Sequence, residues 1–217
     1  MKASHPHPTA SALRGLYAIT SEAICASSAT LLAATEEALA GGARLLQYRD
    51  KWNSADVRAN HAHTLLGLCH EHGALFIIND DVELALNCGA DGVHVGNTDA
   101  SLATARERLG VHAVIGVSCA GSIERALAAQ AGGASYVAFG RFFDSRTKPN
   151  APGSEPSLLN LARPQLQIPI CAIGGVTPHN AGDLIARGAD MVAAVEGVFG
   201  DKDIEAAARH YAQLFQP

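Results

Sequence analysis

Three polar residues at alternate positions end the apolar segment ARLLQYRDK, which covers residues 43–51. They are Gln47, Arg49 and Lys51. Because alternate side chains of an extended chain share one face, this spacing places an amide, a guanidinium and an ammonium group together. Arginine binds phosphate oxygens in a bidentate manner and lysine adds a point charge. The segment therefore indicates a binding site for a phosphorylated small molecule.

Polar groups also follow the other apolar segments that we predict to be strands. They are Asn79, Asp80 and Asp81; Asn97, Thr98 and Asp99; Ser118 and Cys119; Ser145, Thr147 and Lys148; and Gly174 and Gly175. An isolated aspartate at such a place is more often the N-cap of the next helix. Five strand ends with matching polar groups instead favour one shared site for a polyphosphate.

Carboxylates beside a polyphosphate repel it unless a metal ion lies between them. Mg²⁺ typically binds one or two carboxylates together with phosphate oxygens of a substrate. We therefore expect Asp80 and Asp99 to bind Mg²⁺, the one cofactor that the sequence predicts. The backbone amides of Gly174 and Gly175, at the start of a helix, suit a second phosphate. Two phosphate subsites indicate two substrates, which favours a transferase over an isomerase.

Eight apolar segments, separated by helical stretches rich in Ala and Leu, must position these groups. They begin at Gly15, Ala43, Ala74, Gly92, His112, Ser135, Ile168 and Asp190. Glycines at the joints, as in residues 41–43 and 188–190, are typical of helix C-termini that lead into a strand. Repeated helix-to-strand joints imply parallel strands, so we predict a single α/β domain, a (β/α)8 TIM barrel. A doubly wound open sheet is the main alternative, because periodicity does not show closure.

The domain boundaries follow from local composition. Residues 1–13, MKASHPHPTASAL, lack the apolar core of a secretory signal, so we expect a flexible N-terminal tail and a catalytic barrel over residues 14–217. The one long connection, residues 141–156, is rich in Pro and Gly and is either a functional lid or a surface insertion.

The composition excludes several classes of partner. Of the 217 residues 48% are hydrophobic, the formal net charge is −5, and there is no long basic run, so we expect no nucleic-acid partner. No apolar stretch is long enough for a membrane span. The five cysteines are odd in number and form no CxxC motif, which favours reduced thiols in a cytoplasmic protein. The sequence does not decide the oligomeric state, for which a homodimer is kept as an expectation.

Several motifs together resemble one enzyme family. They are GLYAIT, LLQYRDK, INDD, DGVHVGNTD, GVSC, YVAFGRFFDSRTKPNAPG and IPICAIGGVTPHNA. In this order, over residues 14–200, they resemble the thiamine-phosphate synthase (thiamine phosphate pyrophosphorylase) family. The Gln-x-Arg-x-Lys strand and the Thr-Lys-Pro loop are specific to that family, whereas the Ile-Gly-Gly turn is common among phosphate-binding barrels. The resemblance implies an enzyme that joins 4-amino-2-methyl-5-hydroxymethylpyrimidine diphosphate to 4-methyl-5-(2-phosphooxyethyl)thiazole, giving thiamine phosphate and diphosphate.

The resemblance also implies roles for individual residues. The diphosphate is held by Arg49, Lys51, Asn79 and Lys148 with help from Ser118, and Mg²⁺ by Asp80 and Asp99. Gln47 contacts the pyrimidine, while the thiazole phosphate or the diphosphate is approached by Ser145, Thr147, Gly175 and the adjoining pocket residue Val195. The catalytic group is Lys148, Arg49 and Lys51.

The implied reaction is a dissociative substitution, because the electron-rich aminopyrimidine stabilises positive charge at its methylene carbon. Mg²⁺ and the cations lie where negative charge grows on the leaving diphosphate. The thiazole nitrogen carries no proton, so no protein base is assigned. The alternatives are a thiazole tautomerase-like isomerase on the same barrel and a barrel that binds thiamine precursors without turnover.

A few residues fit the site poorly or suggest other sites. Glu196 ends the eighth strand, where a carboxylate would repel the thiazole phosphate, and we expect it to point outward. Cys119 is expected to be buried and inert rather than reactive. His94, on the fourth predicted strand, is expected to face the interior and to be either a packed residue or one that supports a site residue, not a catalyst. The histidines at 61, 63, 70 and 72 suggest a metal site, but we interpret them as exposed helix residues.

Replacing Lys148 tests the role that the resemblance gives to this residue. Lys148→Ala is expected to lose most of the synthase activity, because one cation on the leaving diphosphate is removed. The fold should survive, since the lysine belongs to a predicted loop. Activity and circular dichroism measured on the same preparation check both expectations, and an unfolded variant would contradict the second.

Overall fold

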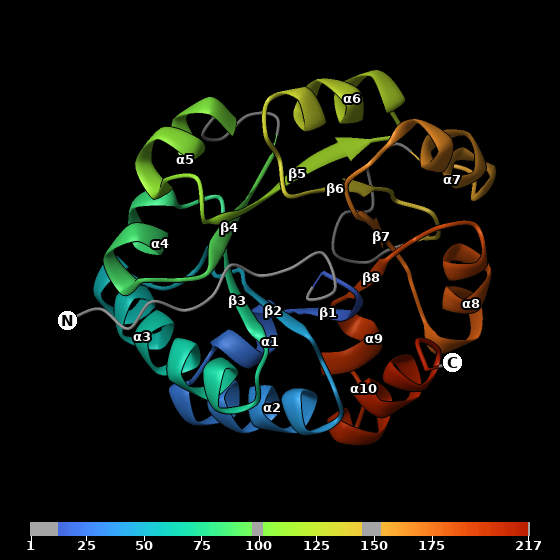
Figure 1. The fold of residues 1–217 in the computed structure, drawn as a ribbon. Helices are drawn as coiled ribbons and strands as arrows, with labels where there is room; N and C mark the ends of the chain where they lie inside the picture. Colours follow the sequence, from blue (N-terminus) through green and yellow to red (C-terminus); the bar gives the residue numbers. More distant parts are fainter. Residues whose placement is uncertain (1–12, 97–101, 145–152, 217) are drawn as a thin grey trace.

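A closed barrel of eight parallel strands forms the centre of the molecule (Figure 1). The computed structural model describes residues 13–96, 102–144 and 153–216. The strands pair in chain order, and β8 returns to β1 with Gly15 opposite Met191. The predicted TIM barrel is therefore confirmed, and the alternative of an open doubly wound sheet is wrong.

The eight strands coincide with the eight predicted apolar segments. They are β1 (Gly15–Ile19), β2 (Leu45–Tyr48), β3 (Leu75–Asn79), β4 (Gly92–Val95), β5 (Val114–Ala120), β6 (Tyr136–Phe139), β7 (Ile170–Ile173) and β8 (Met191–Ala194). Most are four or five residues long, because each strand runs once along the barrel from one end to the other.

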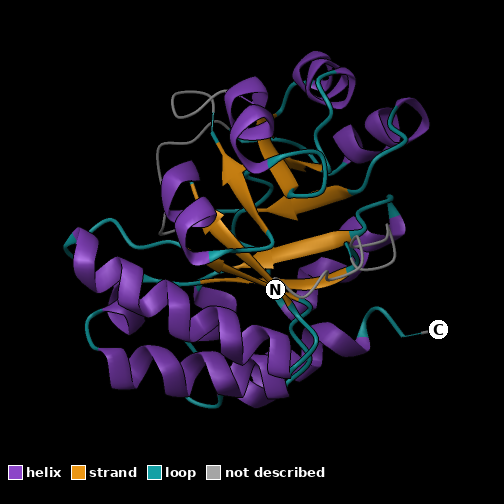
Figure 2. Ribbon diagram, turned by 60° about the vertical axis from the view of Figure 1, so that its left-hand side comes forward, coloured by secondary structure: helices purple, strands orange, loops and turns teal. Residues whose placement is uncertain are grey.

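Helices lie outside the strands of the barrel (Figure 2). They are α1 (Glu22–Cys25), α2 (Ser28–Ala40), α3 (Ala55–Glu71), α4 (Val82–Cys88), α5 (Leu102–Leu109), α6 (Ile123–Ala131), α7 (Ser157–Ala162), the 3₁₀ turn η2 (Arg163–Gln165), α8 (Pro178–Ala186), α9 (Glu196–Phe199) and α10 (Ile204–Gln213). Side chains of Ser27, Ser54, Asp81, Ser122 and Asp203 accept backbone N–H groups at the starts of five of them. These caps satisfy donors that have no partner within the helix. Of the described helices, none has the length and apolar character that crossing a membrane requires.

Two hydrophobic clusters lie on opposite faces of the strands. The outer cluster packs strands against helices and includes Leu46, Phe76 and Val192. The inner cluster fills the barrel and includes Leu45, Tyr17 and Tyr136 as well as the buried Leu13. Because strand side chains alternate between faces, Gln47 points into the barrel like Leu45. The rest of the predicted tail lies outside the described residues.

A glycine in β4 sets how closely two strands approach. A Cβ atom on Gly92 would overlap the backbone carbonyl of Val114, its partner in β5. Neither strand can move away without breaking its pairing on the other side, since the barrel is closed. The absence of a side chain at this position is therefore a requirement of closure.

We expect Gly92→Ala to destabilise the protein by about 1–3 kcal/mol, because the added methyl group forces the strands apart. Gly67→Ala is the matched control. Gly67 lies inside α3, and a Cβ added there would have no contact within 4 Å, so alanine should stabilise by about 0.5–1 kcal/mol. Urea unfolding of both variants measures the difference, and equal effects would contradict this account of β4.

Candidate active site

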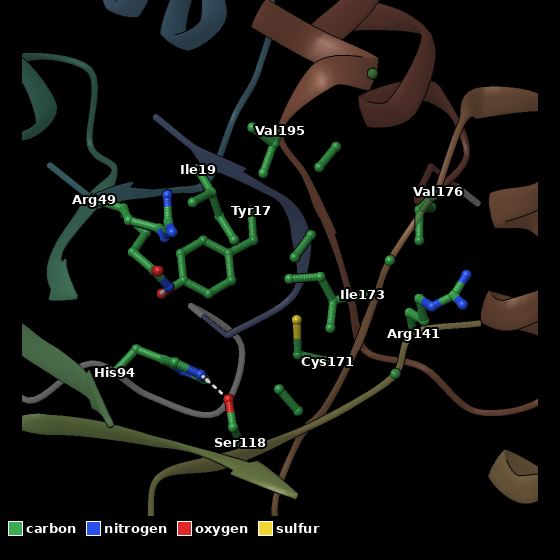
Figure 3. Close-up of a pocket in the computed structure, with 18 of the residues that line it drawn as sticks. Tyr17, Ile19, Arg49, His94, Ser118, Arg141, Cys171, Ile173, Val176 and Val195 are labelled. Carbon is green, nitrogen blue, oxygen red and sulfur yellow. Dashed lines mark hydrogen bonds between the residues drawn. The ribbon is translucent and has the colours of Figure 1, made fainter. Parts of the chain in front are cut away.

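A cavity of about 670 Å³ opens at the carboxyl ends of the strands (Figure 3). Its lining includes the following predicted site residues: Gln47, Arg49, Lys51, Asn79, Asp80, Ser118, Gly175 and Val195. The sequence prediction that polar groups from separate strand ends share one site is therefore correct for the first seven, and Val195 is an apolar residue of the same lining. Asp99, Ser145, Thr147 and Lys148 lie outside the described residues, so their roles stay predictions.

The end of β2 is held by contacts from two directions. The hydroxyl of Thr20 accepts the Arg49 N–H at 2.8 Å and donates to the Arg49 carbonyl at 3.0 Å. The guanidinium of Arg49 lies over the ring of Trp52, 5.4 Å from its centroid, which is cation–π distance. Gln47 is only 3% exposed and donates its amide N–H to the hydroxyl of Tyr17 at 2.8 Å.

Asp50 organises the turn that follows β2. Its carboxylate accepts the backbone N–H groups of Trp52 and Asn53, the Asn53 side-chain amide and the Tyr48 hydroxyl, at 2.8–3.1 Å. Burial opposes ionisation of this carboxyl group, but these hydrogen bonds outweigh it and lower the pKa of Asp50. Asp50 thus fixes the chain between Arg49 and Lys51 on the outer face of the barrel, where Tyr48 lies.

Asp80 and Asp81 have different tasks although they are neighbours. Asp81 is the N-cap of α4, accepting the N–H of Leu84 at 2.9 Å. Asp80 lines the pocket instead, with Lys51 Nζ 3.0 Å from its carboxylate and the Asn79 amide donating to it at 2.5 Å. Its backbone has a positive φ of 65°, a conformation that residues other than glycine rarely adopt. The helix-cap interpretation of Asp80 is therefore wrong.

The carboxyl end of β7 brings backbone close to the pocket. Gly174 and Gly175 have positive φ values of 99° and 63°, and a Cβ on either would overlap the chain at residues 141–144. Thr177 and Asn180 form a capping box at the start of α8. Glycine is required here because the residues between β7 and α8 pass against the loop after β6.

Glu196 departs from its expected position. It is the first residue of α9 and is exposed, and its carboxylate lies beside Gly200. Glu196 nevertheless belongs to the pocket lining, so the expectation that it points outward is wrong. The reason is that β8 ends at Ala194, so the alternation of strand faces does not extend to this residue.

Sequence reasoning missed several residues of the pocket lining. They include Tyr17, Cys171 and Arg141, whose guanidinium lies 2.7 Å from Asp144. His94 is largely buried on the inward face of β4, as expected, and it lines the pocket and contacts Ser118 at 2.9 Å (Figure 3). The signal that was available for Tyr17 is its place in β1, two residues before Ile19, on the inward face.

The remaining histidines and cysteines do not add a second site. Among the described residues no cluster of three or more His, Cys, Asp or Glu side chains suits a metal. His61 is buried rather than exposed, because its ring contacts the Ser28 and Tyr48 hydroxyls at 2.8 and 3.1 Å. All five cysteines are buried, and burial raises the pKa of Cys119 to about 11, so this thiol is inert at neutral pH as expected.

A closed parallel barrel with a polar, charged pocket at the carboxyl ends of its strands defines a TIM-barrel enzyme. The family model for thiamine monophosphate synthase matches residues 16–198. The chain belongs to this family, which confirms the resemblance inferred from the sequence motifs.

Relatives and a solved structure agree with the family match. The chain is 52% identical to the thiamine-phosphate synthase of Thioalkalivibrio sulfidiphilus, over 96% of this chain and 98% of the relative. It is 50% identical to that of Marinobacter nauticus, over 93% and 90%. The structure of thiamine phosphate pyrophosphorylase from Pyrococcus furiosus aligns with a TM-score of 0.86 and 30% identity, covering 95% of this chain and 98% of that one.

Asp50→Asn should destabilise the protein by about 1–3 kcal/mol at pH 7, because charge-assisted hydrogen bonds are lost. The lowered pKa fixes the sign of the pH dependence. The contribution of Asp50 is present above its ordinary pKa of 3.8 and is lost as the pH falls through its folded value. The difference between wild type and variant should therefore shrink below about pH 4.

Asp183→Asn is the control for this experiment. Asp183 forms an exposed i,i+4 ion pair with Arg187 on α8, and its loss should leave stability nearly unchanged. Urea unfolding between pH 3 and 7 measures all three proteins. A gap between wild type and Asp50→Asn that stays constant with pH would refute the account.

Proposed function

We propose that this protein is a Mg²⁺-dependent transferase that condenses 4-amino-2-methyl-5-hydroxymethylpyrimidine diphosphate with 4-methyl-5-(2-phosphooxyethyl)thiazole. The products are thiamine phosphate and diphosphate. The observation that carries the proposal is identity of about half the residues with thiamine-phosphate synthases over nearly the whole chain. The convergence of Gln47, Arg49, Lys51 and Asp80 on one pocket supports it. No observation favours the isomerase or the non-catalytic alternative.

The cationic side of the pocket binds the leaving diphosphate. Arg49, preset by Thr20 and Trp52, offers a planar fork to the phosphate oxygens. Lys51 adds a flexible charge, since its side chain is 52% exposed. Asn79 and Ser118 contribute neutral hydrogen bonds, and Lys148 belongs to this group by its motif. These groups stabilise the negative charge that develops as the carbon–oxygen bond breaks.

Asp80 fits Mg²⁺ by donor chemistry and position. Its carboxylate lines the pocket beside Lys51, and Mg²⁺ is usually held by one or two carboxylates together with substrate phosphate. Asp99 is the second proposed ligand. When bound, the ion neutralises charge on the diphosphate and so makes it a better leaving group.

The opposite side of the pocket receives the thiazole substrate. Backbone amides near Gly175, in the loop between β7 and α8, suit its phosphate, and Val195 adds apolar contact. Ser145 and Thr147 are assigned to this phosphate or to the diphosphate by their motif. The ring nitrogen attacks with its own lone pair, so the pocket needs only to orient it. We further propose a cytoplasmic location, which the five buried thiols support, and keep the homodimer as a prediction.

Incubation with both precursors and Mg²⁺ should yield thiamine phosphate and diphosphate, and EDTA should stop the reaction. Asp80→Ala should lower kcat/KM by about 100-fold and raise the Mg²⁺ concentration needed for half-maximal rate. Asp81→Ala is the matched control, since it removes the cap of α4 and an ion pair with Arg58 but no residue of the pocket lining, and it should cost about 1 kcal/mol of stability with activity retained. Turnover of one precursor alone without metal would replace the transferase by an isomerase.

A further inference from the structure

Five polar side chains form one continuous hydrogen-bond chain beneath the pocket. In order they are Gln47, Tyr17, Tyr136, His94 and Ser118, from β2, β1, β6, β4 and β5. The successive contacts are 2.8, 2.8, 2.9 and 2.9 Å long. Figure 3 shows Tyr17, His94 and Ser118 around the pocket floor, with the last contact dashed. The function proposed above uses only the two ends, Gln47 and Ser118.

Packing fixes the rings in the middle of this chain. Tyr136 is fully buried and Tyr17 is 1% exposed. Their rings meet edge to face with centroids 5.9 Å apart, and the His94 ring stacks on Tyr136 at 5.6 Å. A Cβ on Gly116 would overlap the phenol end of Tyr136, so the glycine leaves the room that this hydroxyl occupies. The contacts therefore belong to the barrel core and do not depend on loop positions.

The number of hydrogens on each group determines the direction of donation along the hydrogen-bond chain. Burial raises the pKa of both Tyr17 and Tyr136, so each phenol keeps its one hydrogen. A phenol with two partners must donate to one and accept from the other. The Gln47 amide donates to Tyr17, so Tyr17 donates to Tyr136 and Tyr136 donates to Nδ1 of His94.

The same count sets the state of His94 and the role of Ser118. Nδ1 of His94 accepts a hydrogen bond, so the ring hydrogen lies on Nε2 and is donated to Oγ of Ser118. The hydroxyl hydrogen of Ser118 must then go to an acceptor other than His94. At the other end, one N–H of the Gln47 amide goes to Tyr17, and the carbonyl oxygen, which takes no part in that contact, is the acceptor that Gln47 offers to a ligand in the pocket.

We propose that Tyr17, Tyr136 and His94 are positioning residues that hold the two ends of the pocket in opposite hydrogen-bonding states. Gln47 presents an acceptor to the exocyclic amine of the aminopyrimidine, and Ser118 presents a donor to a diphosphate oxygen. This inference rests on the proposed function, because it assigns the recognition of that substrate. It adds that the buried residues Tyr17, Tyr136 and His94 determine whether the pocket binds a pyrimidine with an amine or one with a carbonyl group.

Reversing the direction of the hydrogen-bond chain would weaken substrate binding at both of its ends. If the Gln47 amide turned over, every hydrogen along the chain would reverse, and Gln47 would present N–H groups to an amine. Ser118 would present lone pairs to an anion. Breaking the chain at either tyrosine removes the coupling, so the amide can turn over and accept a 4-oxo pyrimidine in place of the 4-amino compound.

The direction of the chain is tested without any substrate by ¹⁵N NMR of histidine-labelled full-length protein. Wild type should show a His94 signal pair with Nδ1 unprotonated and Nε2 protonated, identified by its loss in His94→Gln. Tyr136→Phe should shift this pair toward a mixture of tautomers, because Nδ1 loses its donor. A wild-type His94 with its hydrogen on Nδ1 would overturn the proposed direction, whether or not the protein makes thiamine phosphate.

The specificity is tested by calorimetric binding of the pyrimidine diphosphate and its 4-oxo analogue, in the presence of Mg²⁺ and without the thiazole. Tyr17→Phe and Tyr136→Phe should each reduce the preference for the amino compound by about tenfold, the effect of one hydrogen bond. The control is Tyr211→Phe, which removes a buried hydroxyl that donates to the Val176 carbonyl at 2.8 Å. Its Tm should fall by a similar amount, with the preference and the His94 signals unchanged.

Two results separate this inference from the proposed function. If all three tyrosine variants lose stability equally and keep the wild-type preference, Tyr17 and Tyr136 are merely structural and the inference fails. If wild type binds neither pyrimidine and forms no product, the proposed function fails, and the NMR result alone then judges the direction of the chain.

Discussion

The common direction of the eight strands is the constraint on which the site depends. Parallel pairing all around the barrel places every carboxyl end on one rim, so each strand delivers its last residues to the same cavity. Residues far apart in sequence meet as a result: Tyr17 and Tyr136 are 119 positions apart and share a hydrogen bond of 2.8 Å. A single antiparallel strand would carry its polar end to the opposite rim.

The barrel interior combines two environments that normally exclude each other. One part of it is apolar, with Leu45, Val114 and Met191 in one cluster, whereas the carboxyl ends of the strands surround a polar, charged pocket. Tyr17 and Tyr136 join the two, because each ring is an apolar body with a polar tip. Each hydroxyl at this boundary has protein partners, so polarity enters the core without unsatisfied groups at these two rings. The rings of Tyr17 and Tyr136 therefore belong to the apolar core, while their hydroxyl groups belong to the polar site.

The sequence predicted the strands well because local signals define them. Apolar runs bounded by glycine located all eight, and the spacing of Gln47, Arg49 and Lys51 correctly placed them in one pocket. Barrel closure could not be predicted in this way, since it depends on contacts between the first and last strands. Asp50 and His61 were missed as buried groups, because a charged or titratable residue becomes buried only where distant partners satisfy it. The family resemblance named site residues that local chemistry alone would have left ambiguous.

The pairing of β8 with β1 has a consequence for synthesis on the ribosome. β1 ends at Ile19, whereas its closing partner begins at Met191. At typical elongation rates of about 5–20 residues per second, on the order of ten seconds or more separates the two strands. Throughout that interval the nascent sheet has unpaired edges, which are templates for association with other chains. Helix α10, which packs against α2 and β1, emerges later still, so the contacts that cover β1 are completed only after α10 has also left the ribosome.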